Sequence, residues 1–325
     1  MPSLRRNRGL VVAWMPVSQR SSTLAGRLGF TVVLIKRAGY RSPLTAPLAY
    51  PIAAVRTLAA LIRYRPRAVV VVAPPVVAPL VVVPLARLFR VPVAIDVHSG
   101  ALIDARWRWA IGLMRALTQL AGTACVHLPQ LAPVLRTRRG RVMVVRDPLP
   151  RFAVGSVDQV DTGGMKLVVA VCGWGEDEPV EALVGAAAGR MWRLAVTGKP
   201  RREIPLPSNT QLTGFLDQDA YVRLLASADL IVVLTVRENT LLSGAWEAIA
   251  LHRPLLVSAT SALRDAFGPE VARLEPDAGS IARAIDEVLA DPAAQSRTES
   301  LAARYATEND EAVQRLAGAL GVHLA

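Results

Sequence analysis

The stretch "ENTLLSGAWEAIALHRPLLVS" (238–258) holds two glutamates on either side of a run of small residues. A helix starting here would have Ser243 as its N-cap, Gly244 for close backbone approach and Glu247 in its first turn. Unpaired backbone N–H groups at a helix start stabilise an anion, and a carboxylate beside them can accept hydrogen bonds from two ribose hydroxyls. The alternative is a glutamate that only interacts favourably with the helix dipole.

Two further groups of polar side chains directly follow strand-like runs. His98 lies just past the expected strand end in the segment "IDVHSG" (95–100). A histidine there can exchange protons near neutral pH, and Asp96 can orient it. A histidine with a structural role and an aspartate that only terminates the strand are the alternatives. In "PVSQRSS" (16–22), Ser18 and Arg20 could bind an acceptor phosphate, or the segment is an ordinary strand-to-helix turn.

The elements that must position these residues alternate along the first half of the chain. Helical segments separate apolar runs, and the alternation predicts a doubly wound parallel sheet. The expected strands are 9–14, 30–35, 68–73, 91–96, 123–128 and 141–145. The helix expected over 50–67 has Ile52, Val55, Leu58, Ala59 and Ile62 on one face, which we expect to lie against the core.

The run "RAVVVVAPPVVAPLVVVPLAR" (67–87) has the apolar length of a membrane span but contains four prolines. Each proline costs about 3 kcal/mol inside a helix, and in lipid the freed carbonyl groups find no water. We therefore predict a buried strand at 68–73 and a helix beginning near Pro79.

The second half repeats the alternation, with strands expected in 165–175, 191–198, 229–235, 253–259 and 271–276. The domain prediction is a first Rossmann-like domain over 1–150, a linker over 151–164, a second Rossmann-like domain over 165–300, and a helical tail over 301–325 that can pack back on the first domain. Cys125 and Cys172 lie in strand-like runs without metal-ligand spacing, so we expect free buried thiols.

Charge is distributed unevenly between the two halves. Residues 1–151 contain 23 Lys and Arg against three acids, a net charge of +20, whereas residues 152–325 contain 15 against 23, a net charge of −8. The basic half suits anionic lipid, polyphosphate or nucleic acid. The segment "DARWRWAIGLMR" (104–115) mixes arginine with tryptophan, and with the helix at 50–67 it favours docking on an anionic membrane. A solvated cationic face with locally packed tryptophans is the alternative.

These motifs resemble the GT-B glycosyltransferases, in particular glycosyltransferase family 4 and the related mannosyltransferases that act on dolichyl-diphosphate sugars. The stretch 238–258 carries the resemblance most specifically, supported by "TGFLDQDAYVRLLASADLIVVLT" (213–235) and by the Pro-Pro and Asp-x-His segments of 68–102. The resemblance implies two Rossmann-like domains facing each other across a cleft, with Glu247 on the donor's ribose and His98 at the sugar or the acceptor.

Two features depart from the family pattern. The family separates its two glutamates by one residue fewer than Glu238 and Glu247 are separated here, so Asn239 or Thr240 could take the place of Glu238. The family's Arg and Lys after the first strand of the second domain are absent from "GWGEDEPVEA" (173–182), where Lys199 could substitute. The remaining predicted donor-binding residues are Gly173, Trp174, Gly214, Leu241, Leu242, Ser243 and Gly244.

The sequence thus predicts a metal-independent glycosyltransferase with His98 and Asp96 as catalytic residues, a nucleotide-sugar co-substrate and no other cofactor. The acceptor would be lipid-linked or a cell-envelope glycan, and the protein would be cytoplasmic, possibly peripheral on the inner face of the plasma membrane. A catalytically silent nucleotide-sugar-binding protein on the same fold is the alternative, because the turn at 173–182 is acidic. Nucleic-acid binding ranks low, because no helix-turn-helix, RRM or zinc signature is present.

Overall fold

The computed structural model describes residues 9–16, 18–35, 46–152, 163–238 and 240–324. The chain divides into two compact units, which are considered separately below. The N-unit consists of Met1–Pro148 and Thr307–Ala325, and the C-unit consists of Leu149–Ala306. Asn239 and most of the predicted linker lie outside the described residues.

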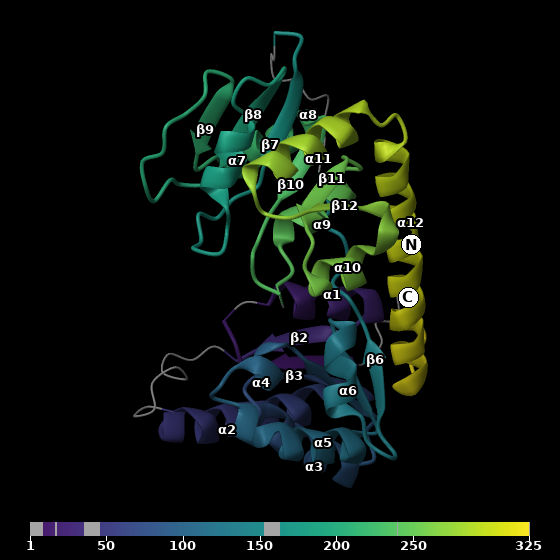
Figure 1. Cartoon of the computed structure of the whole chain (residues 1–325). Coiled ribbons are helices and arrows are strands. Elements are labelled where there is room, and N and C mark those ends of the chain that lie inside the picture. Colours follow the sequence, from purple (N-terminus) through teal and green to yellow (C-terminus); the bar gives the residue numbers. More distant parts are fainter. Residues whose placement is uncertain (1–8, 17, 36–45, 153–162, 239, 325) are drawn as a thin grey trace. The chain divides into compact units, whose positions relative to one another are not determined.

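The N-unit is built on a six-stranded parallel sheet in the order β2-β1-β3-β4-β5-β6 (Figure 1). Its strands are β1 (Gly9–Ala13), β2 (Thr31–Leu34), β3 (Ala68–Ala73), β4 (Val93–Val97), β5 (Thr123–Val126) and β6 (Arg141–Val144). The chain reverses direction across the sheet between β1 and β3, which makes this pair the topological switch point where open α/β sheets bind ligands. All six strands match runs expected from the sequence.

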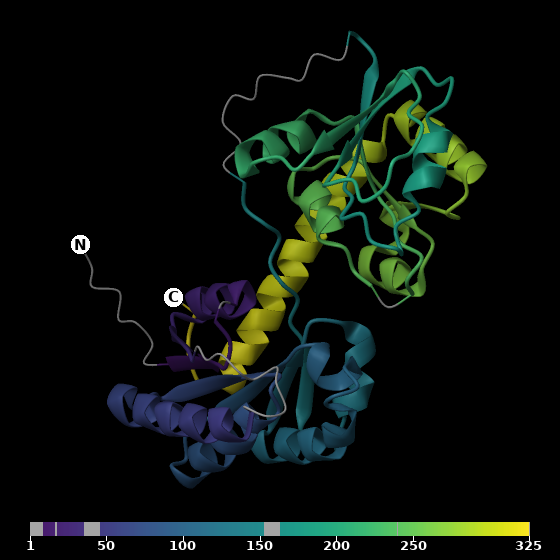
Figure 2. The same ribbon diagram turned by 90° about the vertical axis from the view of Figure 1, so that its left-hand side faces the viewer.

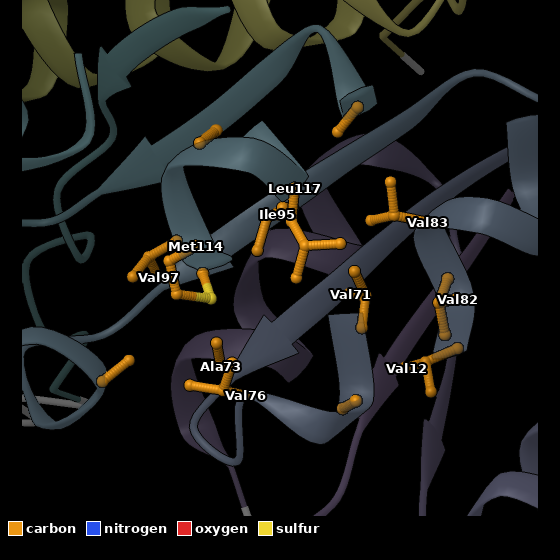
Figure 3. Packing of buried hydrophobic residues seen from close by; sticks show 14 of the residues in the cluster. Val12, Val71, Ala73, Val76, Val82, Val83, Ile95, Val97, Met114 and Leu117 are labelled. Atoms are coloured by element: carbon orange, nitrogen blue, oxygen red, sulfur yellow. The ribbon is translucent and has the colours of Figure 1, made fainter. Parts of the chain in front are cut away.

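Helices cover both faces of this sheet. Its helices are α1 (Gln19–Leu28), α2 (Ala46–Tyr64), α3 (Val77–Leu88), α4 (Gly100–Ile103), α5 (Ile111–Ala121) and α6 (Ala132–Leu135), with 3-10 turns η1 (Arg108–Ala110) and η2 (Pro129–Leu131). Residues of α2, α3 and α5 share one apolar core with the sheet, while α1 and the end of the last helix share the other. In Figure 3, Val71 and Ile95 of the sheet meet Val83 of α3 and Met114 and Leu117 of α5.

The valine-rich run is a strand followed by a helix. Every residue of β3 is buried, because helices cover both faces of the sheet at this central strand. The helix α3 begins at Val77, two residues before the expected start, and continues past Pro84 to Leu88. Across the described ranges, no helix is long and apolar enough to cross a membrane.

The apolar residues expected on one face of the helix at 50–67 do share a face, but this face does not lie against the core. Small residues of α2, among them Ala53 and Ala60, lie against the core with Thr57, which accepts a hydrogen bond from Trp14 Nε1 at 2.9 Å. Ile52, Val55, Leu58 and Ile62 are exposed instead. Alanines let the helix approach the sheet closely, so the larger aliphatic side chains point outward.

The C-unit has a second six-stranded parallel sheet, in the order β12-β11-β10-β7-β8-β9. Its strands are β7 (Lys166–Ala170), β8 (Trp192–Thr197), β9 (Thr210–Gly214), β10 (Leu230–Val233), β11 (Leu255–Ser258) and β12 (Ala272–Leu274). The chain reverses between β7 and β10, which places the switch point there. The edge strand β9 was not expected, because "TQLTG" has a single apolar side chain and lacks the apolar character of the other runs.

The helices of the C-unit flank its sheet. They are α7 (Val180–Ala186), α8 (Gln218–Ser227), α9 (Ser243–Ala250), α10 (Ser261–Phe267) and α11 (Ala278–Ala290), with the 3-10 turn η3 (Gly268–Glu270). The final helix, α12 (Ala294–Ala319), is the long yellow helix of Figure 2. Its residues up to Ala306 belong to the C-unit and those from Thr307 belong to the N-unit.

The end of α12 contributes both apolar and charged contacts to the N-unit. Val313, Leu316 and Leu320 join the core formed with α1 and one face of the sheet. Asp310 pairs with Arg27 of α1, and Glu308 accepts a hydrogen bond from Arg146 at 2.6 Å. Acids from the end of the chain thus neutralise part of the positive charge of the first half.

Candidate active site

The carboxyl edge of the N-unit sheet holds a buried ion pair. Arg20, in the first turn of α1, donates to both carboxylate oxygens of Asp96 on β4, with a shortest distance of 2.7 Å from Nη2. It also donates to Asp147 at 2.7 Å and to the carbonyl of Val145 at 2.8 Å. Asp96 is fully buried. Burial alone would raise the pKa of Asp96, but Arg20 and the bond from His98 hold it well below its usual range.

His98 lies one residue beyond β4 and is held by its backbone and its ring. Its N–H donates to the carbonyl of Ala73 at 2.8 Å, and its Nε2 lies 3.2 Å from Oδ2 of Asp96. Because Asp96 is ionised and only accepts, Nε2 must carry the proton of this hydrogen bond. In the neutral ring, Nδ1 then carries the lone pair and can accept a proton from a substrate hydroxyl.

His127 lies next to His98 and was passed over in the sequence. The pairing of Val97 with Val126 aligns β4 with β5, so the histidine after each strand projects from the same edge. Their ring centroids are 6.2 Å apart in an edge-to-face arrangement. Burial and the charge of Arg20 lower the pKa of His127 to about 4, and its Nδ1 is buried without a hydrogen-bond partner among the described residues. The signal that could have found it is one histidine directly after each of two successive strands.

The predicted acceptor residues are both engaged within the protein. Ser18 is the N-cap of α1: its hydroxyl accepts from the N–H of Ser21 and lies 2.7 Å from the Ser21 hydroxyl. The Arg20 guanidinium is neutralised by Asp96 and Asp147. Their role toward an acceptor phosphate stays a prediction, and it would require Arg20 to bind phosphate beside two carboxylates.

The turn after β7 in the C-unit is closed by its own acid. The carboxylate of Glu178 accepts from the N–H of Gly173 at 3.0 Å and from the N–H of Gly175 at 2.7 Å. Successive backbone N–H groups that point at one anion form the kind of concavity that binds phosphate. Here a side-chain carboxylate occupies it.

A second acid of the same turn spans the switch point of this sheet. Asp177 accepts from the hydroxyl of Thr235, just after β10, at 2.8 Å, and its carbonyl accepts from the N–H of Val236 at 2.8 Å. The two adjacent strands β7 and β10 are therefore tied together directly beyond their carboxyl ends. Arg237 Nε lies 3.6 Å from Asp177 Oδ1, so this basic side chain already has an acidic partner.

Helix α9 starts at the same edge, and two details differ from the prediction. The N-cap is Leu242, which makes no side-chain cap, so Ser243 is the first helical residue. Glu247 consequently lies beyond the first turn, where it accepts a 2.5 Å hydrogen bond from the hydroxyl of Tyr221. Gly244 performs the expected close approach, because a Cβ there would lie 2.6 Å from Val171 Cγ1.

These two edges can be set beside known proteins. No family model and no curated protein matches the chain. Solved structures do: a glycosyltransferase from Rickettsia africae (TM-score 0.69, 9% identity, covering 96% of this chain and 97% of the other), and sucrose-phosphate synthase from Thermosynechococcus elongatus (0.64, 18%, 96% and 98%). Another is Anabaena HepE in complex with UDP and glucose (0.61, 12%, 96% and 99%). Both sheets are covered in each comparison. The chain has the GT-B fold.

The remaining predicted donor residues lie on this GT-B scaffold as follows. Trp174 is buried with a φ of 59°, and its Nε1 donates to the carbonyl of Thr197 at 3.0 Å, so its ring serves the turn. Gly198 is required, because a Cβ there would lie 2.1 Å from the carbonyl of Cys172. Lys199 beside it is exposed, as is Gly173, and Gly214 ends β9 with a positive φ.

Glu238, the other glutamate of the stretch 238–258, contacts the start of α10. Glu238 accepts from both the N–H and the hydroxyl of Ser261, at 2.9 and 2.7 Å, and thereby holds the start of α10. Thr240, Leu241 and Leu242 are partly exposed, and the two leucines pack against the neighbouring core.

The cysteines are free thiols; Cys125 is buried, and burial raises the pKa of Cys172 to about 12. Within the described part of the chain, no group of His, Cys, Asp and Glu is arranged to hold a metal ion.

Proposed function

We propose that this protein is a glycosyltransferase that moves a sugar from a nucleotide-sugar donor to an acceptor hydroxyl. The observation that carries the proposal is the His98–Asp96 pair, in which an ionised carboxylate fixes the tautomer of a partly exposed imidazole. HepE, which has the same fold, has been solved with UDP and with UDP-glucose, which supports a nucleotide sugar as the donor here.

The C-unit would bind the donor at its switch point. Glu247 lies partly exposed on α9, and its carboxylate already takes one hydroxyl hydrogen bond from Tyr221, which is the kind of contact a ribose would make. The N–H groups at the start of α9 and in the turn after β7 would face the diphosphate, where negative charge grows as it leaves. Because these donors would supply the stabilisation, we propose a metal-independent reaction, and activity should persist in EDTA.

The N-unit would bind the acceptor and activate it. His98 Nδ1 takes the proton of the acceptor hydroxyl as its oxygen forms a bond to the anomeric carbon. The bond between that carbon and the diphosphate oxygen breaks, and the nucleoside diphosphate leaves with the electron pair. Asp96 stabilises the imidazolium that results, as a carboxylate beside a histidine base does. A direct displacement of this kind inverts the anomeric configuration, which the proton coupling constants of the product would report.

We further propose a lipid-linked or cell-envelope glycan acceptor and a peripheral location on the inner face of the membrane. The net charge of +20 over residues 1–151 supports an anionic acceptor or surface. A polyprenyl-diphosphate sugar combines the anionic and the lipid character. Comparing water-soluble and lipid-linked acceptors in the same transfer assay separates these classes.

A catalytically silent nucleotide-sugar-binding protein is the second candidate, and Glu178 favours it. Its carboxylate fills the N–H pair that a donor phosphate would use. Thermal-shift screening with UDP-, GDP- and dTDP-sugars, followed by a donor-hydrolysis and transfer assay, separates the two. Binding without turnover would favour the silent protein.

The decisive variant for the donor site is Glu247→Gln, which keeps an acceptor for the Tyr221 hydroxyl. Binding of the donor should weaken about tenfold or more, because a charge-assisted hydrogen bond is replaced by neutral ones. The far-ultraviolet circular dichroism should not change. Tyr221→Phe is the complementary control, since it removes the internal hydrogen bond and leaves the carboxylate. Unchanged donor affinity in Glu247→Gln would remove the donor assignment.

A further inference from the structure

The outward face of α2 carries a stripe of large aliphatic side chains. Ile52, Val55, Leu58 and Ile62 recur along the helix on one side, and Val55 is 67% exposed. The helix connects β2 to β3 in a parallel sheet, so it runs antiparallel to the strands, and the stripe extends from the carboxyl edge of the sheet to the amino edge. Nothing in the described N-unit covers these four side chains.

The stripe continues onto the end of α3. Leu88 and Phe89 are 74% and 68% exposed. Leu58 and Ile62 of α2 line an apolar cavity of about 390 Å³ together with Leu85 and Phe89. Figure 1 shows α2 and α3 next to each other on the outer side of the N-unit. We call the six side chains Ile52, Val55, Leu58, Ile62, Leu88 and Phe89 the α2–α3 face.

Arginines surround this face, and the sequences of α2 and α3 contain no acid. Arg56, Arg63, Arg65, Arg67, Arg87 and Arg90 are exposed on the same two helices and the turns after them. The first 95 residues of the chain contain no Asp or Glu, so no acid of this segment can neutralise them. Arg65 lines the apolar cavity, and the Arg63 guanidinium lies 6.0 Å from the centre of the Tyr64 ring.

The aromatic segment at 104–110 adjoins the beginning of the same helix. Trp109 is exposed and its Nε1 donates to the carbonyl of Arg106, while Trp107 packs against the core. Trp107 and Tyr50, which lies near the start of α2, pack against the same apolar core. An exposed tryptophan beside arginine is typical of the interfacial region of membranes.

We propose that the α2–α3 face docks the protein on an anionic lipid bilayer, with Leu88 and Phe89 inserted and the arginines on lipid phosphates. Charge complementarity selects this occupant: a protein partner would need a patch that is both apolar and strongly acidic, whereas an anionic bilayer presents both properties everywhere on its surface. Arginine also tolerates this position, because its stem can lie along apolar surface while its head reaches the phosphate layer. Docking itself needs neither donor nor acceptor, so it stands independently of the proposed transfer reaction.

The test is co-sedimentation of the purified full chain with vesicles at 0.15 M salt. Wild-type protein should bind phosphatidylcholine vesicles containing 30% phosphatidylglycerol and bind pure phosphatidylcholine vesicles much more weakly. Phe89→Ser should lower the partition coefficient about tenfold or more, because the side chain that enters the acyl region is removed. Arg63→Glu combined with Arg87→Glu should lower it about as much, and this loss should shrink as salt is raised.

The matched control is Phe215→Ser in the C-unit, which removes a phenylalanine that is even more exposed, 88% against 68%, from the turn after β9. It should bind vesicles like the wild type. Variants are compared only after circular dichroism shows unchanged folding. Equal binding by Phe89→Ser and wild type, or no binding by the wild type, would overturn the proposal.

Two other outcomes would also overturn it. Light scattering after size exclusion could show a dimer that Phe89→Ser converts to a monomer without vesicle binding, and the face would then be an interface between two copies. Tight binding of duplex DNA at 0.15 M salt, lost in the arginine variant and without vesicle binding, would assign the arginines to nucleic acid.

Discussion

The two sheets of this protein differ in how the polar groups at their carboxyl edges, where α/β folds bind ligands, find hydrogen-bond and charge partners. At the carboxyl edge of the N-unit, side chains from distant parts of the chain meet, and Arg20 and Asp96 are 76 residues apart. At the carboxyl edge of the C-unit, backbone N–H groups are satisfied by an acid five residues further along the same turn. The N-unit edge is therefore a network of ion pairs between distant segments. At the C-unit edge, a single turn is closed by its own carboxylate, an arrangement that we call a local closure.

The difference suits two different tasks. A fixed network holds one imidazole in one tautomer, which a proton transfer requires. A local closure by one carboxylate can be exchanged for another anion, since both accept the same N–H groups. We therefore propose that the N-unit edge carries out the chemistry and that the C-unit edge binds the anion. The following predictions test that division, beginning with the largest expected effect.

His98→Gln should separate turnover from binding. Transfer should fall by about 10²–10⁴-fold, the usual contribution of a positioned acid or base. Affinity for the nucleotide sugar should stay within about twofold, because the C-unit edge is intact. Steady-state transfer kinetics and calorimetric titration of the donor measure the two quantities on one preparation. A loss of affinity as large as the loss of turnover would break the division of tasks.

Arg20→Leu tests whether the N-unit network also holds the fold. The fully buried Asp96 would keep its charge without its main partner, so the free energy of unfolding should fall by about 3–5 kcal/mol. Urea unfolding followed by tryptophan fluorescence measures the change. The double variant Arg20→Leu, Asp96→Leu is the control, because removing both charges should restore much of the loss. A fall below about 1 kcal/mol in the single variant would mean that water reaches Asp96.

Local sequence patterns were sufficient to predict the buried strands of both sheets. Every residue of β3 is apolar and all but its two alanines are β-branched, and such a run has few alternatives inside a parallel sheet. The strand β9 was not predicted, because an edge strand pairs with a neighbour on one side only, is partly exposed here, and needs no continuous apolar run. The start of α9 differed by one residue from the prediction, which displaced Ser243 from the cap and Glu247 from the first turn.

Contacts between distant segments were not available from local pattern. Helix α2 is apolar on two sides, and periodicity alone favoured the side with the larger residues, whereas packing selected the alanines. Asp96 was considered as an orienter for His98, but its neutralisation by Arg20 depends on how β1, β4 and β6 are ordered in the sheet. The pairing of β4 with β5 brings His127 beside His98, and this is apparent only when the two histidines are considered together with the strands that precede them.

His127 makes the N-unit edge sensitive to acid. Its pKa is lowered from 6.5 to about 4 in the folded protein, so between these values the unfolded chain binds a proton that the folded chain does not. The free energy of unfolding should therefore fall as the pH drops from about 6.5 to 4, by about 2 kcal/mol from this group. His127→Gln and His127→Phe should both flatten this part of the profile relative to wild type. If only one of them does, polarity or packing at this position, rather than titration, controls the slope.

Glu178→Gln tests the C-unit edge and should have the smallest effect. The amide offers one acceptor oxygen in place of two and carries no charge, so the N–H groups of Gly173 and Gly175 become easier for a diphosphate to reach. Affinity for a nucleoside diphosphate should rise about three- to tenfold, which corresponds to about 1 kcal/mol. Glu176→Gln is the matched control: it removes the same charge from an exposed position of the same turn, and so measures the long-range electrostatic part alone. If both variants gain equally, Glu178 acts only through its charge. If Glu178→Gln instead binds more weakly than wild type, the carboxylate shapes the turn for the ligand, and both edges of the molecule are preorganised in the same way.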